Sequence, residues 1–276
     1  MTRKVGITPP FLHNVLRSPL QRQFMPTYSM SKIFCYSILF MFSAAVTCAA
    51  DTPKHLELGR LLVENLIPDT TTYSHQSFIR WKGDFLTDTY SASTDCSGLI
   101  NELLDRSNSS SYDKLLQVSR KRRPRAVDYH NQIMGESGFK RIEKITDILP
   151  GDIIATKYPT GMGSQGKQAD DSGHVMLVDA VPVKRQKFTT PLIENTEQWS
   201  VLVIDSSKSP HGIKDTRYDA ELKRKRSGVG RGTIRIYTVP DGTITGYTFS
   251  LLLSSPYKDG AQIPIAVGRP LYGTMK

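Results

Sequence analysis

The sequence predicts an α+β protein, because helical patterns fill the first half of the chain and strand patterns fill the second half. Up to about residue 134, apolar residues recur at helical spacing. From Phe139 onward, segments rich in β-branched and aromatic residues are separated by turns such as Pro150-Gly151-Asp152 and Pro240-Asp241-Gly242. Helices and strands do not alternate, which argues against a parallel sheet built from βαβ units.

The first fifty residues resemble a secretory signal. Residues 33–48 form an apolar run that follows Lys32 and precedes the small residues Ala49 and Ala50. The run is shorter than the roughly 20 residues that a membrane-spanning helix needs. We therefore predict a signal region at residues 1–50, export to a periplasm or the medium, and one domain at residues 51–276. An uncleaved membrane anchor is the alternative.

The exported part is mildly basic. The whole chain holds 36 basic and 26 acidic residues. Residues 1–50 hold five basic residues and no acidic one, so 31 basic and 26 acidic residues remain, a net charge of +5. This charge suits an anionic envelope polymer and does not call for nucleic acid.

The pattern of apolar residues places the elements in order. Helices are expected at residues 54–67, after Asp95 as far as Ser107, at 112–119 and at 126–134. Residues 70–90 show no clear period and are expected to form an ordered loop. Strands are expected at residues 153–156, 174–181, 200–204, 232–239 and 243–252.

Cysteine usage indicates a single reactive thiol. Cys35 and Cys48 fall in the predicted signal, so only Cys96 remains after export, and it can form no internal disulfide. Cys96 lies at the predicted start of a helix. Unpaired backbone N–H groups and the helix dipole favour a thiolate there and can also hold an oxyanion. The alternative is a small, buried structural residue.

Two further side chains are candidates for a catalytic group with Cys96. His174 begins an apolar strand, and its imidazole suits proton transfer near neutral pH. Asp205 ends the segment Val201-Leu202-Val203-Ile204, where a carboxylate can hold an imidazole in one tautomer. Taken alone, each is more readily explained as an ordinary histidine or a turn-capping aspartate. His211, on the turn after Asp205, is a rival base.

In this order along the chain, the three residues resemble the catalytic residues of papain-like cysteine peptidases of the NlpC/P60 type. Asp95-Cys96-Ser97-Gly98, Leu149-Pro150-Gly151-Asp152-Ile153 and Gly173-His174-Val175 carry the resemblance, which covers roughly residues 70–239. It implies a papain-like α+β fold, with the nucleophile helix packed on an antiparallel sheet of a catalytic domain. It also implies Cys96 as nucleophile, His174 as base and Asp205 as the third polar residue, where many members have His, Asn or Gln.

The same resemblance suggests residues around the reaction centre. Tyr90 and Ser97 are expected to border the substrate or to assist the oxyanion. Asp95 is expected to hold a substrate amine or, equally, to cap the helix. No metal or organic cofactor is implied, and the cysteine and histidines show no metal-ligand spacing.

The implied function is that of an exported cysteine hydrolase cleaving an amide bond, with peptidoglycan peptides as the substrate class. Two alternatives stay open: an acyltransferase or lipid or ester hydrolase that uses the same thiol, and an inactive envelope-binding module. The basic runs Arg120-Lys121-Arg122-Arg123-Pro124-Arg125 and Lys223-Arg224-Lys225-Arg226 are expected to be solvated faces or contacts to an anionic envelope polymer.

Overall fold

The computed structural model describes residues 51–159 and 172–272. The predicted signal at residues 1–50 therefore lies outside the described residues. All described residues belong to one compact unit, Ala49–Lys276. Within the described ranges, every helix is too short or too polar to cross a membrane.

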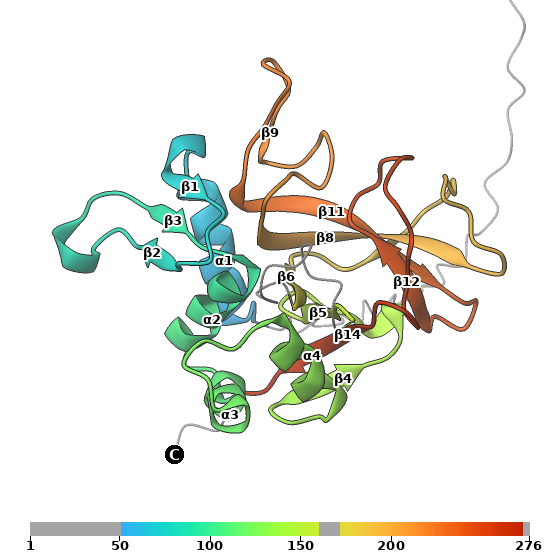
Figure 1. The fold of residues 1–276 in the computed structure, drawn as a ribbon, viewed down its shortest axis with the longest axis horizontal. Helices are drawn as coiled ribbons and strands as arrows, with labels where there is room; N and C mark the ends of the chain where they lie inside the picture. The colour runs from blue at the N-terminus through green and yellow to red at the C-terminus, as the bar shows by residue number, and fades with distance from the viewer. Residues whose placement is uncertain (1–50, 160–171, 273–276) are drawn as a thin grey trace, which may run out of the picture. The chain divides into compact units, whose positions relative to one another are not determined.

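The unit is a mixed α+β structure whose sheets are mostly antiparallel. Its α-helices lie where the apolar spacing predicts them, and Figure 1 shows them grouped beside the sheet. They are α1 (Lys54–Asn65), α2 (Cys96–Arg106), α3 (Ser110–Ser119) and α4 (Ala126–Met134). Three short 3₁₀ segments accompany them: η1 (Pro68–Thr70), η2 (Asp84–Leu86) and η3 (Ile145–Asp147).

A nine-stranded sheet forms the centre of the unit, in the order β13-β12-β11-β8-β6-β5-β14-β4, with β7 also paired to β8. Its strands are β4 (Phe139–Ile142), β5 (Ile153–Lys157), β6 (Gly173–Val178), β7 (Val183–Lys184), β8 (Glu197–Ser207), β11 (Gly228–Thr238), β12 (Ile244–Thr248), β13 (Lys258–Asp259) and β14 (Ile265–Pro270). Every pairing in this sheet is antiparallel.

Two smaller sheets complete the described structure. One joins β1 (Thr71–Thr72), β3 (Ser91–Ser93) and β2 (Phe78–Arg80), with β1 parallel to β3. The other is a hairpin of β9 (Tyr218–Asp219) and β10 (Arg224–Lys225), which projects from the unit in Figure 1.

The structure corrects three details of the sequence prediction. Residues 70–90, expected to be a loop, contain β1 and β2. The strand expected at 243–252 ends at Thr248. β14 was not expected at all, although it lies between β5 and β4 in the sheet. A strand near the chain end shows no partner in its own sequence, because pairing with β4 and β5 depends on contacts more than a hundred residues away.

The two faces of the sheet support separate apolar clusters. Along β6, Val175 and Leu177 join the cluster that also holds the buried side of the helices, whereas Met176 and Val178 join the opposite cluster. Side chains alternate between faces along a strand. His174 therefore falls on the side of Met176, and Asp205 on the side of Val203. The sheet thus presents both polar side chains on the same face.

Candidate active site

Cys96 is the first residue of α2, which packs on β6 and β8. Asp95 caps the helix, since its carboxylate accepts a hydrogen bond from the N–H of Gly98 at 2.8 Å. The backbone N–H groups of Cys96 and Ser97 belong to the first turn of the helix, where N–H groups have no carbonyl acceptor within the helix. They lie at the positive end of the helix dipole. The helix start therefore offers both a site that favours a thiolate and donors for an oxyanion.

His174 stands at the beginning of β6, between its two neighbours β5 and β8. Its backbone N–H donates to Oγ1 of Thr156 at 3.0 Å, and only 12% of its side chain is exposed. Gly173 precedes it with a φ of +142°, and a Cβ there would collide with the carbonyl oxygen of Thr156. The glycine thus allows β6 to begin at this point.

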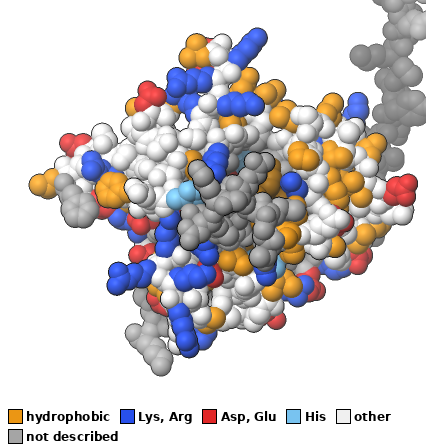
Figure 2. All heavy atoms as spheres, in the orientation of Figure 1, with side chains coloured by type: hydrophobic (Ala, Val, Ile, Leu, Met, Phe, Trp, Pro, Cys, Tyr) orange, Lys and Arg blue, Asp and Glu red, His pale blue; other side chains and the backbone are white. Residues whose placement is uncertain are grey.

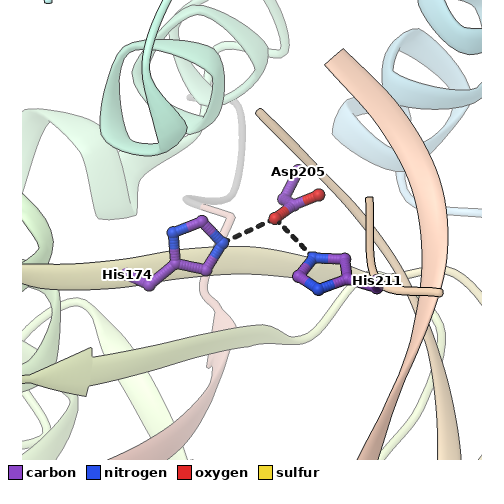
Figure 3. A group of neighbouring side chains, drawn as sticks. All are labelled: His174, Asp205 and His211. Carbon is purple, nitrogen blue, oxygen red and sulfur yellow. Dashed lines mark hydrogen bonds and ion pairs between the residues drawn. The ribbon is translucent and has the colours of Figure 1, made fainter. Parts of the chain in front are cut away.

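Asp205 lies near the end of β8 and is completely buried. Its Oδ2 accepts hydrogen bonds from Nε2 of His174 at 2.5 Å and from Nε2 of His211 at 2.8 Å (Figure 3). Its Oδ1 pairs with Nη2 of Arg217 at 2.8 Å. Burial alone would raise the pKa of Asp205, but the charges of Arg217 and His211 and the two imidazole hydrogen bonds hold it well below the usual range.

The structure brings Cys96, His174 and Asp205 into one group of interacting side chains. His174 hydrogen-bonds Asp205 and also interacts with Cys96, whose charge acts on the imidazole. Because Nε2 faces Asp205, Nδ1 is the ring nitrogen left for the sulfur. Burial lowers the pKa of His174, but the charge of Cys96 and the hydrogen bonds to Asp205 and Cys96 outweigh it and raise the pKa to about 10.

Two cavities of about 340 Å³ each lie beside Cys96 and His174. Cys96 lines one cavity, together with Asp95, Ser97 and Arg123. His174 lines the other, together with the aromatic rings of Tyr158 and Phe249 and with Lys208. Tyr73 and Gly173 line both cavities, so the two cavities are neighbours.

The other expected site residues differ in position. Asp95 and Ser97 line the cavity beside Cys96, and the hydroxyl of Ser97 donates to Oδ1 of Asp95 at 3.1 Å. Tyr90 lines neither cavity; its ring packs edge-on against Trp81 with the centroids 6.3 Å apart. The role of Tyr90 at the substrate stays a prediction. Tyr73 lines both cavities, and no sequence motif marked it.

Asp95 is engaged as a helix cap rather than as a free carboxylate. Nη2 of Arg123 lies 2.6 Å from its Oδ1, and Nδ1 of His75 lies 3.2 Å from its Oδ2. Arg123 belongs to the first basic run, and Lys121 of that run pairs with Asp128 at 2.7 Å. Part of the run expected to be a solvated face therefore stabilises the start of α2.

His211, the rival base, contacts Asp205 and not the sulfur. Its Nε2 is hydrogen-bonded to Oδ2 of Asp205, and its Nδ1 lies 2.6 Å from the carbonyl oxygen of Phe249. Both ring nitrogens are thus occupied. The structure therefore assigns the position beside the thiol to His174.

A metal ion is the other occupant that this cluster suggests. In the described part of the chain, ligand atoms of His174, Asp205 and His211 lie within 4.8 Å of one another. Both imidazoles already hydrogen-bond the carboxylate, and the guanidinium of Arg217 lies 2.8 Å from the same group. A dication would face this fixed positive charge, so we interpret the cluster as a hydrogen-bonded network.

The sequence analysis did not identify Asp215 and Arg217. Arg217 pairs with Asp205, and Asp215 pairs with Arg217. Their signal is Gly228-Val229-Gly230-Arg231-Gly232 in β11. A Cβ at Gly230 would lie 2.6 Å from Nε of Arg217, and one at Gly232 would collide with Asp215. Alternating glycines therefore clear one face of β11 for the segment that carries both charges.

One curated relative covers most of the chain. An uncharacterized protein of Acanthamoeba polyphaga mimivirus, R653, is 38% identical over 224 residues, which cover 79% of this chain and 96% of that protein. No protein-family model matches the sequence. No solved structure matches the chain.

Proposed function

We propose that this chain, which belongs to the same family as uncharacterized protein R653 of Acanthamoeba polyphaga mimivirus, is a cysteine hydrolase that cleaves an amide bond. The observation that carries the proposal is the group of Cys96, His174 and Asp205, in which the imidazole hydrogen-bonds a buried carboxylate and interacts with the cysteine beside two cavities. A structural cysteine needs neither an imidazolium partner nor a place in a cavity wall.

The arrangement of the helix and sheet supports a papain-like fold of the NlpC/P60 type. The cysteine begins a helix that packs on an antiparallel sheet, and the histidine and the third polar residue come from adjacent strands. We propose this finer fold assignment on the order of the three residues together with that geometry. Fold alone does not define the reaction, so the proposed chemistry depends on the site.

In the proposed mechanism, the Cys96 thiolate attacks the carbonyl carbon of the amide. The resulting oxyanion receives hydrogen bonds from the backbone N–H groups of Cys96 and Ser97. The C–N bond then breaks while the imidazolium of His174 gives its proton to the leaving amine, which leaves a thioester on Cys96. Water loses a proton to His174, attacks the thioester and releases a carboxylic acid and the thiolate.

We propose peptidoglycan stem peptides as the substrate class and an exported protein as the active form. Both proposals rest on the resemblance to NlpC/P60 enzymes and on the signal predicted at residues 1–50. Two neighbouring cavities suit a branched peptide, because groups on both sides of the scissile amide need room.

Digestion of purified peptidoglycan tests the proposal. The chain and its Cys96→Ala variant are incubated with peptidoglycan, and released peptides are identified by mass. We expect new amine and carboxyl termini with the wild type and none with Cys96→Ala. His130→Gln is a matched control, because His130 is buried on α4 and lines neither cavity. Intact peptidoglycan in every sample would contradict this substrate, and cleavage of a lipid-ester extract instead would favour the lipid hydrolase alternative.

A contact to an anionic envelope polymer is proposed for the β9–β10 hairpin. Lys223, Arg224 and Lys225 are exposed at its end beside Leu222, which is 69% exposed. Figure 2 shows basic side chains gathered on this projection. Replacing the three cations with serine should abolish retention by a teichoic-acid resin without changing retention by neutral dextran. Unchanged retention would contradict the contact.

A further inference from the structure

The carboxylate of Asp205 is shared by three donors rather than one. His174 and His211 both donate to Oδ2, from opposite sides in Figure 3, while Arg217 lies against Oδ1. The side chains of His211 and Arg217 are 4% and 1% exposed, and Asp205 is completely buried. Water cannot compensate a charge at this depth, so the partners must do so.

His211 must carry a positive charge to satisfy its neighbours. Its Nδ1 faces the carbonyl oxygen of Phe249 at 2.6 Å, and its Nε2 faces the carboxylate of Asp205 at 2.8 Å. Neither partner can donate a hydrogen bond, since Asp205 is ionised. A neutral imidazole has one N–H, whereas two acceptors require an N–H on each nitrogen. The hydrogen bonds therefore define an imidazolium.

The carboxylate of Asp215 pairs with the guanidinium of Arg217. This carboxylate accepts Nε of Arg217 at 2.9 Å, Nη2 of Arg217 at 2.7 Å and the backbone N–H of His211 at 2.8 Å. The same carboxylate therefore holds His211 and Arg217, two of the three residues that contact Asp205. Gly230 and Gly232 of β11 leave the space in which this segment lies.

The charges of this group balance when Cys96 is a thiolate, while the neighbouring buried carboxylate of Asp95 is paired separately with Arg123. The anions are then Cys96, Asp205 and Asp215, and the cations are His174, His211 and Arg217. Lys208, which lines the cavity beside His174, is exposed and lies outside this buried group. A neutral His211 would leave the network with a net negative charge, which favours a protonated thiol over the thiolate.

We propose that His211 and Arg217 are positioning residues, which hold Asp205 ionised and in one orientation so that the proton of His174 stays available to the leaving amine. The inference rests on the proposed cysteine hydrolase. Because His211 donates a hydrogen bond to the same oxygen as His174, this oxygen is less able to take the proton from Nε2 of His174. Arg217 prevents the carboxylate from rotating away, since it binds the other oxygen.

The test measures alkylation of Cys96 by iodoacetamide from pH 5 to pH 10. His211→Phe keeps the contact with Phe249, because the two rings are already stacked at 6.2 Å, but removes both donors. We expect alkylation at pH 6 to slow about tenfold to hundredfold, with the rise in rate displaced about one to two pH units upward. At pH 10 the rates should converge. His211→Gln, which can still donate to Asp205, should fall between wild type and His211→Phe.

Matched controls separate the possible failures. His130→Phe changes a buried histidine outside the network and should leave the profile unchanged. Slow wild-type alkylation at pH 6 would overturn the proposed hydrolase, whereas fast alkylation in both wild type and His211→Phe would overturn only the positioning role. If His211→Phe does not fold, nitrogen-15 NMR of histidine-labelled wild type replaces it. A neutral tautomer assigned to His211 at pH 7 would overturn the inference.

Discussion

His174 and Asp205 lie on adjacent strands and face the same side of the sheet, which places Nε2 of the imidazole 2.5 Å from Oδ2 of the carboxylate. This contact leaves Nδ1 for the sulfur of Cys96. The geometry orders the three groups as a thiol, an imidazole and a buried carboxylate. Disturbing any one of these groups should change the reactivity of the site or the stability of the fold.

The thiolate is expected to depend on His174. At pH 6, Cys96 of the wild type should react with iodoacetamide about tenfold or more faster than glutathione, because the imidazolium stabilises the thiolate. His174→Gln should react no faster than glutathione, while His130→Gln should match the wild type. Equal rates in wild type and His174→Gln would show that the contact does not activate the thiol.

Amide cleavage should decline in alkaline solution. Since the pKa of His174 is raised to about 10, the imidazolium that protonates the leaving amine persists through neutral pH and disappears as the pH rises through about 10. The measurement is kcat/KM for the released amine between pH 7 and pH 11. A decline centred near the ordinary histidine value of about 6.5 would contradict the assignment.

Asp205 should stabilise the fold above acid pH. Its pKa is held well below the unfolded value of about 3.9, so its contribution is present above that value and is lost as the pH falls towards the folded pKa. Below pH 4, the wild-type free energy of unfolding should fall by up to about 1.4 kcal/mol per pH unit more than that of Asp205→Asn. At pH 7 the variant should be less stable by about 3–5 kcal/mol, because it leaves buried cations unpaired. Parallel urea-unfolding curves for the two proteins across this pH range would contradict the prediction.

Gly173 should tolerate no side chain. Gly173→Ala combines a φ of +142° with a collision against Thr156, so we expect a loss of about 3 kcal/mol or more and slow alkylation of Cys96. Gly83→Ala is the matched control, since Gly83 has a φ of +93° and no described atom lies within 4 Å of the point where its Cβ would stand. It should cost about 1 kcal/mol and leave alkylation unchanged. Thermal unfolding and alkylation rates check both variants.

Chelation should leave the reaction intact. If His174, Asp205 and His211 form a hydrogen-bonded network, dialysis against EDTA changes neither alkylation nor amide cleavage. Loss of cleavage that zinc restores would instead identify the cluster as a metal site. Metal content of the purified chain, measured by mass spectrometry, provides a second readout.

The elements of the fold could be predicted where the pattern is local. The stripe of apolar residues after Asp95 predicted α2, and four of its members are completely buried: Leu99, Ile100, Leu103 and Leu104. Burying each such side chain contributes about 1.5–3 kcal/mol, so the stripe is a strong signal. The small strands β1 and β2 have no comparable pattern, because they depend on pairing with β3.

The sequence by itself determined the candidate groups: a cysteine at a helix start, a histidine at a strand start and an aspartate near a strand end. Such features are local, since helix periodicity, strand alternation and the cap at Asp95 involve residues within a few positions. Only the tertiary structure decided that His174 and not His211 contacts the thiol, that Arg123 neutralises Asp95, and that Arg217 lies beneath Asp205. Those contacts depend on how distant segments pack, because burial makes each charge require a partner that no local pattern identifies.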